Sequence, residues 1–314
     1  MKGPMVSIII PVYNAENYLP ITITSLLWQK NKDFEVLFVD DGSPDGSVEL
    51  IQRQMQGSQL NWRLIRQENR GQGAARNTGF LEAKGEWVLF LDADDAVQDY
   101  TVDLCSRMAT QYPDTDVIFS GYWTVDGQAA LKRTEEVPGE VVVTREQLLK
   151  DFLTRKTVFL VPGTLYKREF LHRAQLLHTQ IPWSEDQYFM WQVMDRLHSA
   201  VVCKSVLYNY VQHGGPSIMR STPLDKMLSA YEQYRELPGE IDDPQVKKYL
   251  LPRWCLGCLH VFAHRGDRVS FDAFWKATGF TRSCKTLLRF PEWKIRILAL
   301  AGLVCKPLMF RMMR

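Results

Sequence analysis

Short apolar runs recur at regular intervals through the first 120 residues of the chain. Five of them are nearly continuous in hydrophobic residues: VSIIIPV (6–12), FEVLFVD (34–40), WRLI (62–65), WVLFL (87–91) and DVIFS (116–120). Helix-like segments separate these runs, which start about 25–30 residues apart. Strands that are apolar on both faces and alternate with helices are typical of a parallel sheet covered on both sides. The pattern predicts an α/β domain with a mostly parallel sheet.

Polar clusters follow the first four predicted strands. They are PVYN (11–14), DDGSPDGS (40–47), ENRGQGAARN (68–77) and DADD (92–95). In open parallel sheets, ligands bind beyond the carboxyl ends of the strands. We therefore expect the four clusters to share one edge of the sheet.

The DADD cluster places Asp92, Asp94 and Asp95 within four positions. Two carboxylates about 4 Å apart repel by roughly 4 kcal/mol at an effective dielectric constant of about 20. Such a group is usually solvated, hydrogen-bonded or bound to a cation. Hard divalent cations take oxygen ligands, so a metal ion is one candidate partner.

The DDGSPDGS cluster allows two interpretations. Asp45 or Ser47 fits the cap of a following helix, which needs no ligand. Asp40 and Asp41 lie at the strand end instead, where a carboxylate can accept hydrogen bonds from an imide N–H or a ribose hydroxyl.

The ENRGQGAARN cluster combines glycines with a cation. Gly71 and Gly73 let the backbone approach a ligand, and Arg76 offers a guanidinium fork for phosphate. The order of residues matches neither the GxxxxGK[ST] loop nor the GxGxxG fingerprint.

Composition limits the partners and the compartment. The chain has 314 residues, 46% of them hydrophobic and 24% charged, which suits one large domain, alone or with a smaller one. A formal net charge of +2 gives no global attraction to nucleic acid, and no such partner is expected. Six scattered cysteines and an amino terminus without a signal-type apolar stretch indicate a cytoplasmic, reduced protein.

One cysteine pair, Cys255 and Cys258, has CxxC spacing, with His260 and His264 close behind. Metal binding or redox chemistry is one interpretation. On a continuous helix, however, these side chains fall on different faces and cannot surround one tetrahedral ion. We expect buried core thiols.

Taken in order, PVYNAENYL, VDDGSPDGS, ENRGQGAARNTG and LDADD resemble the GT-A fold glycosyltransferases of the large inverting family 2. The resemblance covers roughly residues 5–125, and WSEDQYF (183–189) and YNYVQHGGPSI (208–218) extend it to about residue 220. It implies a GT-A glycosyltransferase domain over 1–221, with a nucleotide-binding part at about 5–125 and an acceptor and catalytic part at about 126–221. A helical carboxyl-terminal extension is expected over 222–314.

The resemblance also implies roles for individual residues. Asp92 would contact ribose or the donor sugar, Asp94 would hold a divalent metal, Mn²⁺ or Mg²⁺, and Asp95 would support them or cap a helix. The residues expected to frame the nucleotide are Pro11, Tyr13, Asp41 and Arg76.

The WSEDQYF segment has the pattern of a helix start. Ser184 can cap the helix and Gln187 occupies the capping-box position. Glu185 and Asp186 are then first-turn carboxylates, which the helix dipole favours without any catalytic role. By the resemblance, Asp186 is the catalytic base and Glu185 a supporting or acceptor-binding group, and the two interpretations are compatible.

The YNYVQHGGPSI segment is interpreted as a loop. Tyr208, Tyr210, His213 and Ser217 surround the pair Gly214 and Gly215, and loops with such hinges can close over a substrate. His213 is expected either to meet the diphosphate or metal or to be a surface residue.

The carboxyl-terminal tail is strongly basic. Residues 282–314 contain eight Lys or Arg and one acid, Glu292, a balance of 8 − 1 = +7. The run ILALAGLVC (297–305) is far shorter than the ~20 residues that span a bilayer. Residues 290–314 either lie on a membrane surface or form an ordinary packed terminal helix.

The expected activity is transfer of a hexose or N-acetylhexosamine from a nucleotide sugar, most plausibly UDP-linked, to a sugar hydroxyl with inversion. The expected acceptor is a growing cell-surface polysaccharide or a lipid-linked saccharide, at the inner face of the cell membrane. Two alternatives remain: a non-catalytic sugar-nucleotide-binding or scaffold protein, and a DxD metal-dependent phosphotransferase.

Overall fold

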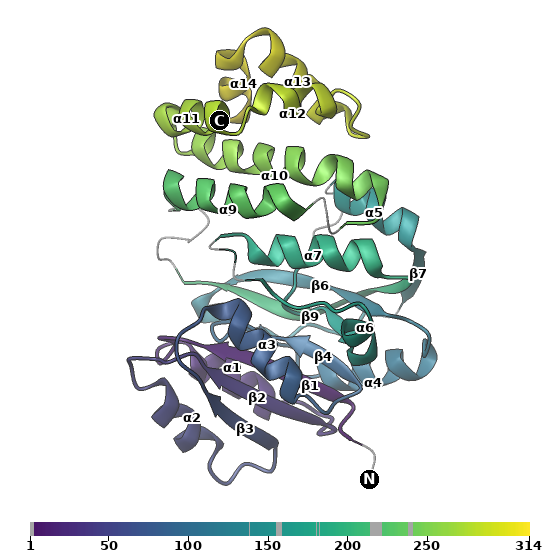
Figure 1. The fold of residues 1–314 in the computed structure, drawn as a ribbon. Coiled ribbons are helices and arrows are strands. Elements are labelled where there is room, and N and C mark those ends of the chain that lie inside the picture. The colour runs from purple at the N-terminus through teal and green to yellow at the C-terminus, as the bar shows by residue number, and fades with distance from the viewer. Residues whose placement is uncertain are drawn as a thin grey trace. The chain divides into compact units, whose positions relative to one another are not determined.

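The computed structural model describes residues 3–137, 139–154, 159–179, 181, 183–213, 222–237 and 241–314 (Figure 1). Two compact units make up the chain. The first, here called the sheet unit, comprises Met1–Arg145, Phe159–Gln180 and Arg196–Gly215. The second, the helical unit, comprises Glu146–Val158, Ile181–Asp195 and Pro216–Arg314. Each unit is built from three separate segments of the chain. The functional boundary at residue 221 stays a prediction.

All five apolar runs form strands of one mixed sheet, which confirms the predicted α/β class. The strands are β1 (Val6–Val12), β2 (Phe34–Asp40), β3 (Asn61–Arg66), β4 (Trp87–Phe90) and β6 (Val117–Asp126). The first four lie in the order β3-β2-β1-β4, and each neighbouring pair is parallel.

Four further strands complete the nine-stranded sheet over the described residues. They are β5 (Ala96–Val97), β7 (Glu140–Thr144), β8 (Leu165–Lys167) and β9 (Ser199–Gln212). Strand β8 lies between β4 and β6 and is antiparallel to both, so these two predicted strands are not neighbours. Strand β9 runs parallel to β6.

The interpretation of YNYVQHGGPSI as a loop is wrong for its first half. Tyr208 and Tyr210 lie in β9, because this stretch pairs with β6 on one side and β5 on the other. Gly214, Gly215 and Ser217 lie outside the described residues.

Helices cover both faces of the sheet, as the continuous hydrophobicity of its strands requires. One face of β1 presents its even-numbered residues to a core shared with α1 (Leu19–Leu27), α2 (Ser47–Met55) and α4 (Thr101–Gln111). The opposite face packs against α3 (Gln72–Glu82). There Gly79 lies so close to the sheet that an added Cβ would stand 2.4 Å from Ile9 Cγ2 and 3.2 Å from Val39 Cγ2.

The remaining helices lie mostly in the helical unit. Of these helices in the described residues, α6 (Arg168–Arg173) belongs to the sheet unit, together with the 3₁₀ turn at Gly127–Ala129. The others are α5 (Arg145–Leu153), α7 (Glu185–Arg196), α9 (Leu224–Glu236), α10 (Pro244–His264), α11 (Arg268–Ala277), α12 (Phe280–Leu287), α13 (Trp293–Val304) and α14 (Lys306–Met313). The helical extension expected after residue 222 is therefore observed.

Helix α10 runs through the core of the helical unit. Asp243 caps it by accepting hydrogen bonds from the backbone N–H groups of Gln245 (2.8 Å) and Val246 (3.0 Å). Trp254 on this helix stacks on Tyr234 of α9, with ring centroids 4.3 Å apart. Over the described residues, none of the helices combines the length and the apolar character that crossing a bilayer requires.

The CxxC pair occupies this same helix, as expected. Cys255 and Cys258 are buried free thiols, and burial raises the pKa of both well above the usual range. Thiols of this kind are poor nucleophiles and poor metal ligands. Both side chains therefore pack in the core of the helical unit, as the sequence analysis predicts.

Candidate active site

The carboxyl ends of the parallel strands meet at one edge of the sheet. Val12 of β1 stands in register with Asp40 of β2, and Asp40 with Arg66 of β3. The backbone N–H of Leu91, just after β4, donates to Ile9 of β1 at 3.0 Å. The polar clusters that follow these strands are thus brought together, as predicted. Within the first cluster, Pro11 is buried in β1 and Tyr13 is 53% exposed.

Asp41 fixes the glycine-rich loop. Its buried carboxylate accepts hydrogen bonds from the backbone N–H groups of Arg70 (2.9 Å) and Gly71 (2.7 Å) and from Gln67 Nε2 (2.7 Å). Gly71 has a φ of +89°, which a glycine adopts without strain. Asp41 therefore shapes the loop that opens α3, and its contact with a nucleotide stays a prediction.

The other residues of the second cluster have structural partners. Asp40 accepts a hydrogen bond from the Ser43 backbone N–H at 3.0 Å and lies 3.5 Å from Arg66 Nε. Asp45 accepts from the Ser47 backbone N–H at 3.2 Å, at the first residue of α2. The N-cap residue of α2 is Gly46, so Asp45 stabilises the start of the helix from the preceding position and is not its cap.

Arg76 faces a carboxylate. Its side chain is fully buried, and its Nη2 donates to Asp92 Oδ1 at 2.7 Å. Gln72, one turn earlier on α3, donates to the same oxygen at 2.9 Å. These two donors hold the Asp92 carboxylate in one orientation, and the predicted contact between Arg76 and phosphate is untested.

A buried histidine that the sequence analysis did not identify packs beside Arg76. His178 is held by Asn77 of α3, which accepts from the His178 backbone N–H at 2.8 Å and donates to its carbonyl at 2.7 Å. Burial, with the nearby Arg76 charge, lowers the pKa of His178 well below its usual value. The ring is therefore neutral.

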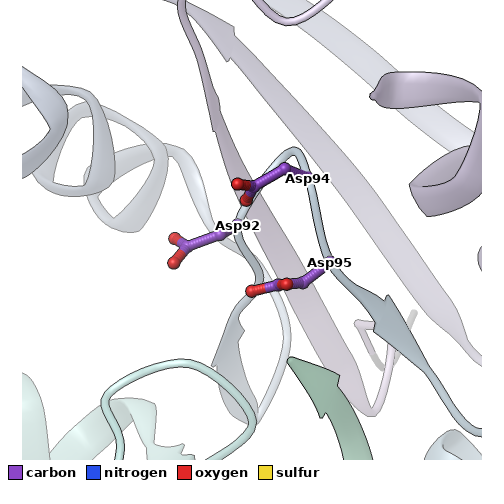
Figure 2. A group of neighbouring side chains, drawn as sticks. All are labelled: Asp92, Asp94 and Asp95. Atoms are coloured by element: carbon purple, nitrogen blue, oxygen red, sulfur yellow. The ribbon is translucent and has the colours of Figure 1, made fainter. Parts of the chain in front are cut away.

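The three carboxylates of DADD converge. One oxygen from each of Asp92, Asp94 and Asp95 lies within 4.8 Å of the other two. Figure 2 shows the three side chains leaving a single turn toward the same side. Partial burial and the adjacent Asp92 charge raise the pKa of Asp94 to about 6. The turn concentrates more negative charge than its protein neighbours neutralise, which is the condition under which a divalent cation binds.

Asp95 ties this turn to β9. Its carboxylate accepts hydrogen bonds from the Tyr208 hydroxyl and from the Val211 backbone N–H, the latter at 2.6 Å. Burial and the charges of Asp92 and Asp94 raise its pKa. Thr22 of α1 donates to the Asp95 carbonyl at 2.7 Å. Of the two expected roles, support of the cluster fits and helix capping does not.

His213 lies against the same turn. Its Nε2 is 2.9 Å from the Asp94 carbonyl oxygen and 3.9 Å from the Asp94 carboxylate, and its ring packs on Tyr18 with centroids 4.3 Å apart. The side chain is only 19% exposed. These contacts favour the site role of His213 over the surface alternative.

Glu185 and Asp186 form the first turn of α7, so the predicted helix start is confirmed. Ser184, just before them, has a φ of +66°, in the left-handed region that non-glycine residues rarely adopt. Its carbonyl accepts a hydrogen bond from the Tyr234 hydroxyl at 2.7 Å. Both acids belong to the helical unit, and the role of Asp186 as a base stays a prediction.

Comparison with protein families decides which class of protein this is. Residues 7–174 match the model of glycosyl transferase family 2. The chain belongs to this family. It is therefore a glycosyltransferase, and the phosphotransferase and non-catalytic alternatives are set aside.

Curated relatives of this family 2 enzyme include three proteins of Bacillus subtilis. The uncharacterized glycosyltransferase EpsJ of Bacillus subtilis is 29% identical over 234 residues, 73% of this chain and 67% of the relative. The putative glycosyltransferase EpsH of the same organism is 28% identical over 70% of this chain and 64% of the relative. The minor teichoic acid biosynthesis protein GgaA, also from B. subtilis, is 30% identical over 60% of this chain and 43% of its own length.

Solved structures share the fold. TarS 1-349 from S. aureus, crystallised in complex with UDP-GlcNAc, superposes with a TM-score of 0.73 at 20% identity, covering 97% of this chain and 88% of that one. The mannosyltransferase PcManGT from Pyrobaculum calidifontis, in complex with GDP-Man and Mn²⁺, gives 0.56 at 16% identity, with the same coverage. Both likenesses support the GT-A architecture.

We expect the metal-free protein to carry a pH-dependent destabilisation at Asp94. Because its folded pKa of about 6 lies above the ordinary value of 3.8, this group loses stabilising free energy as pH rises from about 4 through 6. Asp94→Asn should therefore be more stable than the wild type at pH 7.5 in the presence of a chelator. The advantage should shrink toward pH 4.5, with a slope of at most about 1.4 kcal/mol per pH unit.

Urea unfolding of both proteins at several pH values measures this difference. A stability difference that stays constant from pH 4.5 to 7.5 would show that Asp94 titrates normally.

Proposed function

We propose that this family 2 enzyme transfers a hexose or N-acetylhexosamine from a UDP-linked donor to a sugar hydroxyl, with inversion of the anomeric centre. The proposed acceptor is a growing cell-surface polysaccharide or a lipid-linked oligosaccharide. The convergence of three carboxylates at the edge of the sheet carries the proposal. The UDP-GlcNAc complex of TarS supports the choice of donor, and the role of GgaA in teichoic acid biosynthesis supports the choice of pathway class.

The metal site is proposed at Asp94, with Asp92 beside it. Asp94 is the most accessible of the three carboxylates, with 48% of its side chain exposed, whereas Asp92 is 20% exposed and Asp95 buried. Burial and the adjacent Asp92 charge raise its pKa to about 6, and the nearby His213 offsets this rise only in part. A divalent cation held here, Mn²⁺ or Mg²⁺, would stabilise the charge on the departing nucleoside diphosphate.

The nucleotide is proposed to lie along the same edge. Pro11 lies near the end of β1 and Tyr13 directly follows the strand, and Asp41 with the backbone of Gly71 forms the neighbouring wall. Arg76 acts here by orienting Asp92, toward which its guanidinium is directed. His213 is positioned to steer the Asp94 carboxylate through its contact with the Asp94 backbone.

The base is proposed to be Asp186, with Glu185 as a supporting or acceptor-binding group. The strained backbone at Ser184 supports this assignment, since left-handed residues other than glycine cluster at functional sites. The Tyr234 hydrogen bond to the Ser184 carbonyl holds the strained residue in place. Asp186 would take the proton of the acceptor hydroxyl while the bond to the sugar forms.

Attachment to the inner face of the cell membrane is proposed through residues 290–314. Helix α13 has two apolar faces: Ile295, Ala299 and Gly302 are buried, whereas a second row points to solvent. That exposed row is Trp293 (59%), Ile297 (43%), Leu300 (53%) and Val304 (77%).

The exposed row suits a lipid surface. Its members are spaced four, three and four residues apart and therefore lie along one side of the helix. Lys294 and Arg296, both exposed, flank this row on its two sides. A tryptophan in an apolar row bordered by cations is typical of a helix that lies in the headgroup region of a bilayer.

The metal role of Asp94 predicts a loss of metal-dependent stabilisation. UDP with Mn²⁺ or Mg²⁺ should stabilise the wild type more than UDP alone. The increment should be about 2.7 kcal/mol when the free metal concentration is one hundred times the Kd of the metal for the UDP-bound protein. Asp94→Ala should abolish the increment due to the metal. Asp114→Ala, which removes an exposed carboxylate elsewhere in the sheet unit, is the matched control. Thermal unfolding measures all three, and a normal metal increment in Asp94→Ala would remove Asp94 from the site.

The base role of Asp186 predicts that transfer and donor binding separate. Asp186→Asn keeps the shape of the side chain and should lower the transfer rate by ~10²–10⁴, with UDP affinity nearly unchanged. Asp225→Asn, at a first-turn acid of α9, controls for a helix-dipole effect. Rates and UDP affinities are measured on the same preparations. Near-normal transfer by Asp186→Asn would rule out the base, and lost UDP binding would point to a structural role.

Membrane contact through α13 predicts a sensitivity to the exposed row. The double variant Trp293→Ser with Leu300→Ser should bind vesicles containing anionic lipid at least about tenfold more weakly, because each buried apolar side chain contributes about 1.5–3 kcal/mol. Val269→Ser replaces an apolar side chain that is 82% exposed on α11 and serves as the control. Vesicle sedimentation measures the binding. Equal sedimentation of the double variant and the control would end the membrane assignment.

A further inference from the structure

A basic hollow lies between α10 and α12 in the helical unit. It encloses about 480 Å³ and is lined by Lys248, Arg282, Lys285, Thr286, Leu288 and Arg289. Four of the six lining residues are cations, and no acidic residue lines it. Its size falls in the range of small-molecule sites, but its lining excludes an apolar ligand.

The backbone fixes these cations in place. Arg282, Lys285 and Arg289 follow each other at intervals of three and four residues, so they lie on one side of α12 and its last turn. The opposite side of the helix is anchored by the buried Cys284 and Leu287. The Tyr249 hydroxyl of α10 donates to the Arg289 carbonyl at 2.8 Å and joins the two helices.

These cations have no carboxylate partners among the described residues. Elsewhere in the helical unit, Arg268 and Lys306 both pair with Asp272, at 2.9 Å and 2.8 Å. Lys248 only approaches the ring of Tyr249, with Nζ 4.9 Å from its centroid. Four like charges around one hollow repel, and an anion placed there relieves the repulsion.

Stabilisation of the helix end does not explain the arrangement. Cations near the last turn of α12 interact favourably with the helix dipole, which accounts for Lys285 and Arg289. Arg282 lies in the first turn of α12, where the dipole disfavours a positive charge. Lys248 belongs to a different helix. A ligand that attracts all four cations accounts for both.

We propose that this hollow binds a phosphate group of a phosphorylated ligand. Two guanidinium groups offer paired N–H donors to phosphate oxygens, two ammonium groups add point charge, and the Thr286 hydroxyl adds a further donor. The exposed Leu288 side chain borders the site and can contact an apolar part of the same ligand. Two sources share this chemistry: a soluble phosphorylated saccharide and the headgroup of an anionic lipid. The hollow belongs to the helical unit and the carboxylate cluster to the sheet unit, and the proposal does not depend on the proposed function.

The test uses the full chain with a chelator present, which keeps metal-dependent binding out of the measurement. Pyrophosphate and glucose 1-phosphate are titrated by calorimetry against the wild type and against the double variant Arg282→Gln with Arg289→Gln. The double variant should bind these probes at least about tenfold more weakly, since a hydrogen bond to a charged group contributes about 1.5–3 kcal/mol. Lys226→Gln with Lys276→Gln removes two exposed cations from α9 and α11, away from the hollow and from residues 290–314, and is the matched control.

A second arm identifies the source of the phosphate. Vesicles of phosphatidylcholine with phosphatidic acid are sedimented with the same three proteins. Loss of vesicle binding in the hollow variant, with weak binding of the soluble probes by the wild type, assigns the site to a lipid headgroup. Loss of soluble-probe binding alone assigns it to a phosphorylated saccharide.

Two results would overturn the proposal. One is a wild type that binds neither soluble phosphate nor the anionic vesicles better than the hollow variant does. The other is an equal loss in the hollow variant and in the α9 and α11 control, which would show general electrostatic attraction. The altered residues are exposed, and an unchanged melting temperature confirms that each variant is folded. Binding of UDP with metal should be the same in all three proteins, so a failed donor site and a failed phosphate site are distinguishable.

Discussion

Repulsion among three carboxylates on one turn is the constraint to which the rest of the sheet unit conforms. Asp92 is oriented by Arg76 and Gln72 from α3, and Asp95 by Tyr208 and Val211 from β9. Thr22 of α1 holds the turn backbone from a third direction. Polar groups from α1, α3 and β9, three elements far apart in sequence, therefore all bind this single turn. Of the three carboxylates, only that of Asp94 accepts no side-chain hydrogen bond within the described part of the chain, and this is why the metal role is proposed for it.

Much of this arrangement was predictable from the sequence, because it rests on local signals. Strands β1, β2 and β4 are buried along their whole length and are hydrophobic almost throughout, so their apolar runs could be identified in the sequence. Polar residues that follow parallel strands must meet at one edge, so the clusters around Asp41 and Asp92 were placed together. Helix α7 was identified from a serine and two acids at its start. These signals are carried by neighbours in the chain.

The contacts that the sequence analysis missed depend on distant partners. Strands β5 and β8 have two and three residues, too few to show a period. Strand β9 mixes polar and apolar residues. Its buried Asn209 accepts a hydrogen bond from Gln98, 111 positions earlier, and donates one to the Ala130 carbonyl, 79 positions earlier. The two apolar faces of α13 gave the sequence an uneven pattern, and only burial separates the covered side from the exposed one. The pairing of Arg76 with Asp92, 16 positions away, was not predicted, and the contact of Arg76 with phosphate stays a prediction.

The glycine at position 79 has a consequence for the charges at the sheet edge. Gly79 and Arg76 lie three residues apart on α3, and therefore on the same side of the helix. A side chain at position 79 would lift the helix from Ile9 and raise Arg76 with it. Because residue 79 has no Cβ, α3 can pack close to the sheet. This distance determines whether the Arg76 guanidinium reaches the Asp92 carboxylate. The close packing that Gly79 allows at one turn of α3 thus positions the Arg76–Asp92 ion pair at the next turn.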